Sequence, residues 1–272
     1  MNNLICPVCG KNLTLNGKSY VCESHHCFDI AKQGYVNLLT SIHKAGSLIG
    51  DNRDMAVSRR HFLEKGYFDA LSEALQLFIL GHKKATPVIT DICCGEGYYG
   101  DYIKKRINCE MYGFDLSKEM VKLAASRKNG CLYFVANLSR IPLKDSCCDF
   151  ALHLFAPFHE KEFSRILADD GYLISVIPGE NHLFELKQAL YDTPYKNDEQ
   201  APKTESLILS DTIKVTRKIH LCSSEDITAL FKMTPYYYHT KRQDKEKLAS
   251  LSSLDVTTEF VLLIYKKPTI LD

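Results

Sequence analysis

The chain has 272 residues, of which 45% are hydrophobic and 25% charged, and its net charge is +1 at pH 7. This composition is that of an ordinary globular protein with a sizeable core, and it excludes a disordered chain or one that binds nucleic acid by bulk positive charge. No apolar run reaches the roughly 20 residues that cross a bilayer, so we expect no membrane partner. The first residues, MNNLICPVCG, lack the basic start and apolar core of a signal peptide, and the 11 cysteines then indicate a reducing, cytoplasmic setting.

Residues 1–38 contain a metal-binding pattern, C-x2-C-x12-C-x3-H, formed by Cys6, Cys9, Cys22 and His26. Three thiolates and an imidazole are the donors of a tetrahedral zinc site, and four protein ligands leave no open position for chemistry. Asn16-Gly17 between the two pairs predicts a hairpin turn. We therefore expect a small zinc ribbon with a structural ion. Because His25 and Cys27 flank His26, spacing alone leaves the fourth ligand open.

Residues 39–84 form a helical connector in this interpretation. A short strand is expected at 34–39, and from Asp54 the apolar residues recur at helical spacing as far as Phe78. The basic residues Arg59, Arg60 and His61 fall together on this segment. They are either a solvated helix face or a contact for nucleic-acid phosphates. Gly66 to Phe68 interrupts the helix, and an aromatic side chain there can cover a cofactor.

The stretch 88–99, VITDICCGEGYY, predicts a strand, a tight glycine turn and a helix. In parallel α/β sheets such a turn brings backbone N–H groups against a nucleotide-like ligand. The strand ends at Asp91, and the turn contains Gly95, Glu96 and Gly97. Asp115 ends the next strand, where its carboxylate can accept hydrogen bonds from a ribose diol.

The acidic residue inside this turn separates two cofactor classes. Glu96 would repel the pyrophosphate of NAD, but it suits a cationic ligand without phosphate. We therefore favour S-adenosylmethionine (SAM), which carries a sulfonium, over NAD. A tight turn without any ligand is the remaining alternative.

Strands and helices alternate across residues 85–272, which predicts a doubly wound, Rossmann-like sheet of the SAM-dependent methyltransferase type. Seven strands are expected, near 88–92, 110–115, 131–135, 148–154, 171–177, 213–219 and 259–265, and Ser117 is expected to cap a helix. The third strand ends at Asn137, whose amide can pair with an adenine edge. The fourth ends beside Phe155 and Phe158, which either stack a substrate base or pack around a proline turn.

Four separated motifs, HCFDIAKQGYVNLL, RRHFL, DICCGEGYY and IPGENHLFELK, occur in this order. Over nearly the whole chain the sequence resembles the 23S rRNA (guanine-N1-)methyltransferases, the RlmA family. The resemblance implies a guanine in a hairpin loop of 23S rRNA as substrate, a homodimer, and a zinc module that helps to grip RNA. It also implies that His26 is the fourth zinc ligand and that Phe68 or its neighbour Tyr67, Gly95, Glu96 and His182 contact SAM. Some members of the family protect the ribosome from macrolide antibiotics.

One residue departs from the family's turn, D-I-G-C-G-E-G: Cys93 stands at the first glycine. If φ is positive at this position, the side chain costs on the order of 1–2 kcal/mol. In that case we predict that Cys93→Gly tightens SAM binding.

The proton on guanine N1 must leave during methylation, but the sequence identifies no catalytic base. His153, His159 and Glu160 lie near the end of the fourth strand, and water or the RNA itself can also accept the proton. Two other functions stay open. One is a small-molecule SAM methyltransferase, and the other is a non-catalytic RNA-binding relative whose SAM affinity is weakened by Cys93.

Overall fold

The computed structural model describes residues 3–40, 53–82 and 84–268. These ranges form a small three-stranded sheet and a large eight-stranded sheet. In order across, the large sheet contains β10 (Ile208–Leu221), β11 (Leu254–Lys266), β9 (Leu167–Pro178), β8 (Cys148–Leu154), β5 (Val88–Ile92), β6 (Glu110–Asp115), β7 (Leu132–Val135) and β4 (Val36–Asn37). β11 is antiparallel to both of its neighbours, and the strands from β9 to β4 are parallel.

The predicted doubly wound sheet is confirmed, and all seven expected strands belong to it. The count of seven is one too low for the described residues, because β4 adds an eighth strand. β4 lies inside the short strand expected at 34–39 and pairs in parallel with β7, with Val36 opposite Phe134. A strand of two residues has no periodicity that could show which sheet it joins.

The sheet is covered by helices that connect its strands. Those in contact with it include α2 (Asp69–His82), α3 (Tyr98–Lys104), α4 (Lys118–Ala125) and α5 (Glu160–Ile166). As predicted, Ser117 caps α4, and its Oγ accepts a hydrogen bond from Met120 N (3.4 Å). No helix within the described ranges is both long enough and apolar enough to cross a bilayer.

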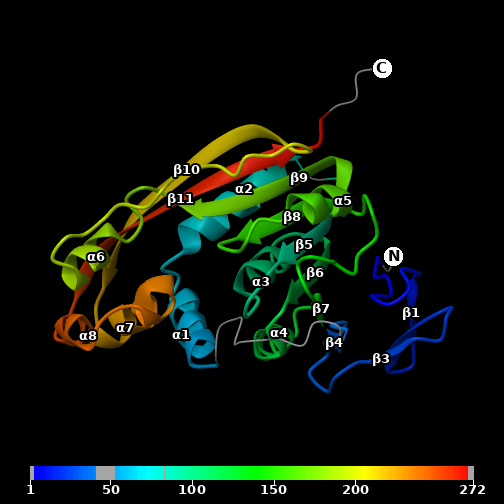
Figure 1. Ribbon diagram of the computed structural model, residues 1–272, viewed down its shortest axis with the longest axis horizontal. Helices are drawn as coiled ribbons and strands as arrows, with labels where there is room; N and C mark the ends of the chain where they lie inside the picture. Colours follow the sequence, from blue (N-terminus) through cyan, green and yellow to red (C-terminus); the bar gives the residue numbers. More distant parts are fainter. Residues whose placement is uncertain (1–2, 41–52, 83, 269–272) are drawn as a thin grey trace.

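A group of helices lies beyond one end of the long strands β10 and β11. Figure 1 shows α6 (Phe184–Leu190), α7 (Ser224–Lys232) and α8 (Arg242–Ala249) gathered there, next to α1 (Arg53–Glu64). A short 3-10 helix, Pro235–Tyr238, connects α7 to α8. The zinc ribbon lies at the opposite side of the sheet, beside β4 and β7.

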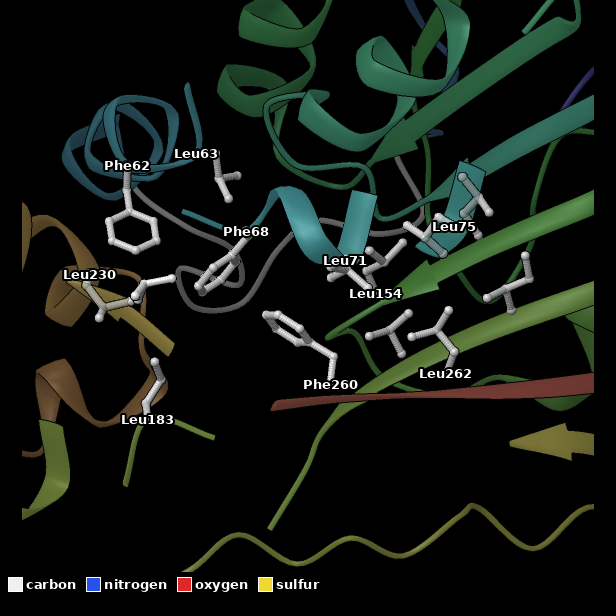
Figure 2. Close-up of a cluster of buried hydrophobic side chains, with 14 of the residues drawn as sticks. Phe62, Leu63, Phe68, Leu71, Leu75, Leu154, Leu183, Leu230, Phe260 and Leu262 are labelled. Atoms are coloured by element: carbon white, nitrogen blue, oxygen red, sulfur yellow. The ribbon is translucent and has the colours of Figure 1, made fainter. Parts of the chain in front are cut away.

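Buried hydrophobic side chains form two large clusters. One of them joins α1, α2, α7 and the strands, and Figure 2 shows Phe62, Phe68, Leu71, Leu154 and Phe260 converging in it. This cluster attaches the helical group to the sheet. The helices at the far end of β10 and β11 therefore belong to the same folded unit as the strands.

The second cluster unites the zinc ribbon with the sheet. The ribbon contains β1 (Leu13–Asn16), β2 (Ser19–Cys22) and β3 (Cys27–Asp29), and its predicted hairpin turn is present, with φ 60° at Gly17. Leu4 and Leu13 of the ribbon share this cluster with Phe134 of the sheet. A backbone bridge links Leu4 to Leu143, so the ribbon is docked on the sheet and is not a free appendage.

Candidate metal and cofactor sites

The four predicted zinc ligands lie together at one end of the ribbon. The ligand atoms of Cys6, Cys9, Cys22 and His26 are all within 4.8 Å of one another. His26 Nδ1 is 3.5 Å from Cys6 Sγ and 3.4 Å from Cys22 Sγ, and the sulfurs of Cys9 and Cys22 are 3.7 Å apart. A tetrahedron with Zn–S of about 2.3 Å and Zn–N of about 2.0 Å has edges of roughly 3.5–3.8 Å. The cluster therefore fits zinc.

The alternatives for the fourth ligand lie outside this cluster. His25 and Cys27 are both exposed, and neither is among the clustered donors of the described residues. The pKa of the Cys9 thiol is lowered to about 6, above all by a hydrogen bond from the Lys11 backbone. A lowered pKa favours the thiolate, which is the form that binds metal.

The glycine turn between β5 and α3 has a left-handed backbone at three positions. φ is 54° at Cys93, 54° at Gly95 and 80° at Gly97. A Cβ added at Gly97 would lie 2.8 Å from Ala124 Cβ, so no side chain fits there. The turn is tied to the next strand by Cys94 N–H, which donates to Phe114 O (2.8 Å). The φ of Cys93 is therefore positive, which was the condition for predicting that its side chain is strained. A residue with a side chain occupies a conformation that favours glycine.

Two carboxylates, of Asp115 and Asp91, accept hydrogen bonds from the backbone of this turn and of the residues that follow it. Asp115 accepts hydrogen bonds from Gly95 N (3.0 Å) and from Ser117 N (2.8 Å), so both of its oxygens already support the backbone. Asp91 is 2% exposed and accepts a hydrogen bond from Gly100 N (3.2 Å). The pKa of Asp91 is raised to about 7, chiefly by burial and to a lesser extent by the nearby carboxylates of Asp115 and Glu96. The structure thus places Asp91 and Asp115, the two carboxylates predicted to lie at the cofactor site, beside the turn.

Glu96 is buried within the turn between two arginines. Its carboxylate contacts Arg127 and lies 3.7 Å from Arg60 Nε, while its Oε1 has no hydrogen-bond partner among the described residues. An unpaired buried acceptor calls for a donor. A ligand with ammonium or hydroxyl groups can supply one, whereas a phosphate cannot. This acceptor therefore fits a ligand that brings a donor to the turn, such as SAM, and does not fit a phosphate at the same position.

Helix α1 lies over the turn, which sequence reasoning did not foresee. Arg59 Nη1 is 3.3 Å from the position that a Cβ would take at Gly95, and Arg60 pairs with Glu64 (3.0 Å) as well as with Glu96. Arg60 matches neither interpretation of the basic segment 59–61, which was a solvated helix face or a contact for nucleic-acid phosphates. It pairs instead with carboxylates of its own chain. No local pattern reveals such a pairing, because Glu96 is distant in sequence and lies in another element.

Phe68 and His182 meet in the aromatic part of the core. The Phe68 ring is 5.0 Å from that of Phe260 and 5.9 Å from that of His182. Nδ1 of His182 accepts a hydrogen bond from Glu259 N (3.1 Å), and burial lowers the pKa of His182 to about 3, so its ring is neutral. Tyr67 is half-buried beside Phe68 and turns its hydroxyl away toward α7.

Asn137 follows β7 next to the end of β6. The preceding residue, Ala136, donates its N–H to Asp115 O (3.1 Å), which places the two strand ends side by side. The Asn137 Oδ1 accepts hydrogen bonds from Ser139 N (2.9 Å) and Ser139 Oγ (3.0 Å). Its carbonyl oxygen is thus engaged in a turn.

Two of the three candidates for a base have structural partners. His153 is 3% exposed, its ring nitrogens contact Ser175 Oγ (2.9 Å) and Pro157 O (3.1 Å), and burial lowers its pKa to about 4. Glu160 Oε1 accepts hydrogen bonds from the loop at 205–207. His159 Nδ1 is buried without a partner among the described residues.

The two candidate stacking residues differ in exposure. Phe155 is 48% exposed and has a φ of 56°, whereas the Phe158 ring packs against Phe163 (5.2 Å) and Tyr265 (5.7 Å). A left-handed, exposed aromatic residue at a strand end is a strained arrangement of the kind found at functional sites.

Comparisons with known proteins find family matches for both the ribbon and the sheet domain. Residues 4–47 match the family model for the RlmA N-terminal zinc ribbon, and residues 89–171 match that for a methyltransferase domain. YxjB of Bacillus subtilis, provisionally named a 23S rRNA (guanine-N1-)methyltransferase, is 32% identical over 96% of this chain and 96% of its own length. The chain belongs to the 23S rRNA (guanine-N1-)methyltransferase family.

Two further relatives support this assignment. The 23S rRNA (guanine(748)-N1)-methyltransferase of Streptomyces fradiae is 34% identical over 69% of this chain and 67% of its own. A provisionally named 23S rRNA (guanine-N1-)methyltransferase of Micromonospora griseorubida is 31% identical over 69% of this chain and 70% of its own. Together with the fold and the metal cluster, membership in the family confirms a SAM-dependent methyltransferase with a zinc ribbon.

Proposed function

We propose that this protein transfers a methyl group from SAM to N1 of a guanine in a hairpin loop of 23S rRNA. The observation that carries the proposal is the match along almost the whole chain to enzymes named for this reaction, which includes both the zinc ribbon and the cofactor turn. A small-molecule methyltransferase would need no such ribbon.

The cofactor site, in this proposal, surrounds the turn after β5. The residues that would border SAM are Tyr67, Phe68, Asp91, Gly95, Glu96, Gly97, Asp115, Asn137 and His182. The unpaired Oε1 of buried Glu96 supports this placement, because it is an acceptor that awaits a donor. When bound, SAM would supply a methyl group on a positively charged sulfur. The carboxylate of Asp91 would complement that charge, whereas the Glu96 carboxylate is already paired with Arg127 and Arg60.

The chain's own part in the reaction is chiefly to position the base. Displacement at a methyl group needs the attacking nitrogen in line with the bond that breaks, so orientation accounts for much of the rate. Phe155, exposed at the end of β8, is placed to stack on an unpaired guanine and present its Watson–Crick edge. His153 and Glu160 are held by structural partners, and we assign no catalytic base.

The stacking role proposed for Phe155 can be tested by substitution. Phe155→Ala should weaken RNA binding by about tenfold, since stacking on an aromatic ring is worth about 1–3 kcal/mol per base, and should leave SAM affinity unchanged. Phe155→Tyr keeps a ring and serves as the matched control. Equal RNA affinity in all three proteins would contradict the role.

The assembly follows from the same family. We propose a cytoplasmic homodimer in which residues 1–38 help to grip the RNA, residues 39–84 connect them to the rest, and residues 85–272 carry out methyl transfer. Docking of the ribbon on the sheet through Leu4 and Leu143 supports this division of labour, since RNA held by the ribbon would stay close to the catalytic unit.

The reaction is tested with labelled SAM and unmodified 23S rRNA, followed by mapping of the product by primer extension. N1 methylation blocks base pairing, so reverse transcriptase should stop beside one guanine of a hairpin loop. Methylation of small molecules without RNA would instead show the first alternative enzyme. Absence of SAM binding in calorimetry would show the non-catalytic relative.

A further inference from the structure

A buried carboxylate, Asp226, joins α7 to the segment that follows α1. Its side chain is 4% exposed and lies in the first turn of α7, where its backbone N–H donates to Ser223 Oγ (3.2 Å). Its oxygens accept hydrogen bonds from Lys65 Nζ (2.5 Å), Tyr67 Oη (2.9 Å) and His61 Nε2 (3.3 Å). One side chain thus fixes three points on residues 61–67.

These hydrogen bonds are strong because Asp226 is charged. Burial opposes its ionisation, but the hydrogen bonds from Lys65, Tyr67 and Ser223 lower the pKa of Asp226 below its usual value. A buried carboxylate that lost these partners would be left as an uncompensated charge. The contact between α7 and the 61–67 segment is therefore firmly held.

Helix α1 connects this anchor to the cofactor turn. Its last residues lead to Lys65, while Arg60, in the middle of the helix, lies 3.7 Å from the Glu96 carboxylate. Arg59 lies against Gly95. The same rigid element therefore touches the turn with one part and Asp226 with the other.

We propose that Asp226 is a positioning residue for the cofactor, which holds α1 over the Gly95–Glu96 turn and fixes the Tyr67 hydroxyl before SAM arrives. The inference rests on the proposed function only in taking this turn as the SAM site. Without the anchor, the segment 61–68 must be ordered at the moment of binding, and ordering side chains and backbone then lowers affinity. Asp226 acts through α1 and does not itself touch the turn.

The proposal is tested by calorimetry of SAM binding to the full chain. Asp226→Ala should raise the Kd of SAM about tenfold, and Lys65→Gln, which removes one partner at the surface, about threefold. Asp255→Ala is the matched control, because Asp255 pairs with His220 at an exposed site (2.7 Å) on the same part of the chain. Its Kd should stay within about twofold of wild type.

Two further measurements distinguish positioning from general loss of structure. Hydrogen exchange of residues 53–68 should rise in Asp226→Ala while β5 and β6 stay protected. In a double-mutant cycle, Tyr67→Phe should have little added effect on SAM affinity in the Asp226→Ala protein.

The outcomes separate the two proposals. Wild-type SAM affinity in both Asp226→Ala and Lys65→Gln would overturn the role of Asp226. Should Asp226→Ala fail to fold, Lys65→Gln decides alone, with a raised Kd in support and an unchanged Kd against. Absence of SAM binding in the wild type would overturn the proposed function itself.

Discussion

The zinc ribbon and the cofactor turn both gather polar groups around a ligand, but they draw on different supports. In the ribbon, four side chains from the segments 6–9 and 22–26 converge at one point, and two of them, Cys6 and Cys22, are buried against the sheet. In the turn, backbone groups are held by the carboxylates of Asp91 and Asp115, at the ends of two neighbouring strands inside the large sheet. A module as short as the ribbon needs its metal to fold, whereas a turn embedded in a large core is formed before its ligand binds.

The largest expected effect is on the ribbon. Cys6→Ser removes a buried ligand, and the ribbon should lose its zinc and become sensitive to limited proteolysis within residues 1–38. Zinc content by mass spectrometry and the cleavage sites give the readout. Cys27→Ser is the control, because Cys27 is exposed and outside the donor cluster. Zinc loss in the control as well would mean that the ligand set is wrong.

The next effect concerns the shape of the turn. Gly97→Ala forces a side chain into a left-handed position 2.8 Å from Ala124 Cβ, so it should destabilise the fold by about 2–4 kcal/mol. Thermal unfolding should shift down by about 5–15 °C. Gly81→Ala, in α2 with no atom within 4 Å of the added Cβ, should be neutral or slightly stabilising. An unchanged melting temperature for Gly97→Ala would show that the turn is not rigid.

A smaller effect should appear in the pH dependence of SAM affinity. The pKa of Asp91 is about 7, so its carboxyl group loses its proton between pH 6 and 8. A cationic ligand prefers the carboxylate, and the Kd should therefore fall as the pH rises, by up to about tenfold. Asp91→Asn should bind SAM with a flat pH profile. A pH-dependent profile in the variant would assign the effect to another group.

The same group also makes folding stability depend on pH, with the opposite sign. The folded pKa of Asp91 is raised from 3.8 to about 7, so the folded state binds more protons than the unfolded state between these values. Its contribution to stability is present below pH 4 and is lost as the pH rises toward 7.

The smallest effect concerns Cys93. Its φ of 54° exists without any ligand, so Cys93→Gly should relieve strain in the free protein and raise its stability by about 1 kcal/mol. SAM binding should also tighten, as predicted for a positive φ, and calorimetry measures that separately. Cys93→Ala keeps the Cβ and should show no gain in melting temperature. Equal gains in both variants would assign the effect to the thiol.

Local patterns predict the parts of this molecule that are built locally. The zinc ligands, the Asn16-Gly17 hairpin and the turn after β5 each depend on residues close together in sequence, where spacing determines geometry. The choice of His26 over its neighbours needed the family resemblance. The expected positions of β5, β6, β7 and β8 agree with the structure because buried parallel strands are continuous apolar runs.

What escaped prediction depends on contacts between distant segments. The joining of β4 to β7, the docking of Leu4 on Leu143 and the pairing of Arg60 with Glu96 have no local signature. Asp226 is 159 residues from Tyr67 and follows an ordinary helix cap. Such pairings are selected by the folded core as a whole, and only the structure reveals them.

The difference between the two sites is tested most directly by hydrogen exchange of the zinc-stripped protein. Amides of β1, β2 and β3 should exchange as in an unfolded chain, while those of β5 and β6 should keep their protection and gain more on addition of SAM. Ribbon strands that stay protected without zinc would contradict the account. Loss of protection in β5 and β6 would contradict it equally, since the cofactor turn would then depend on the metal.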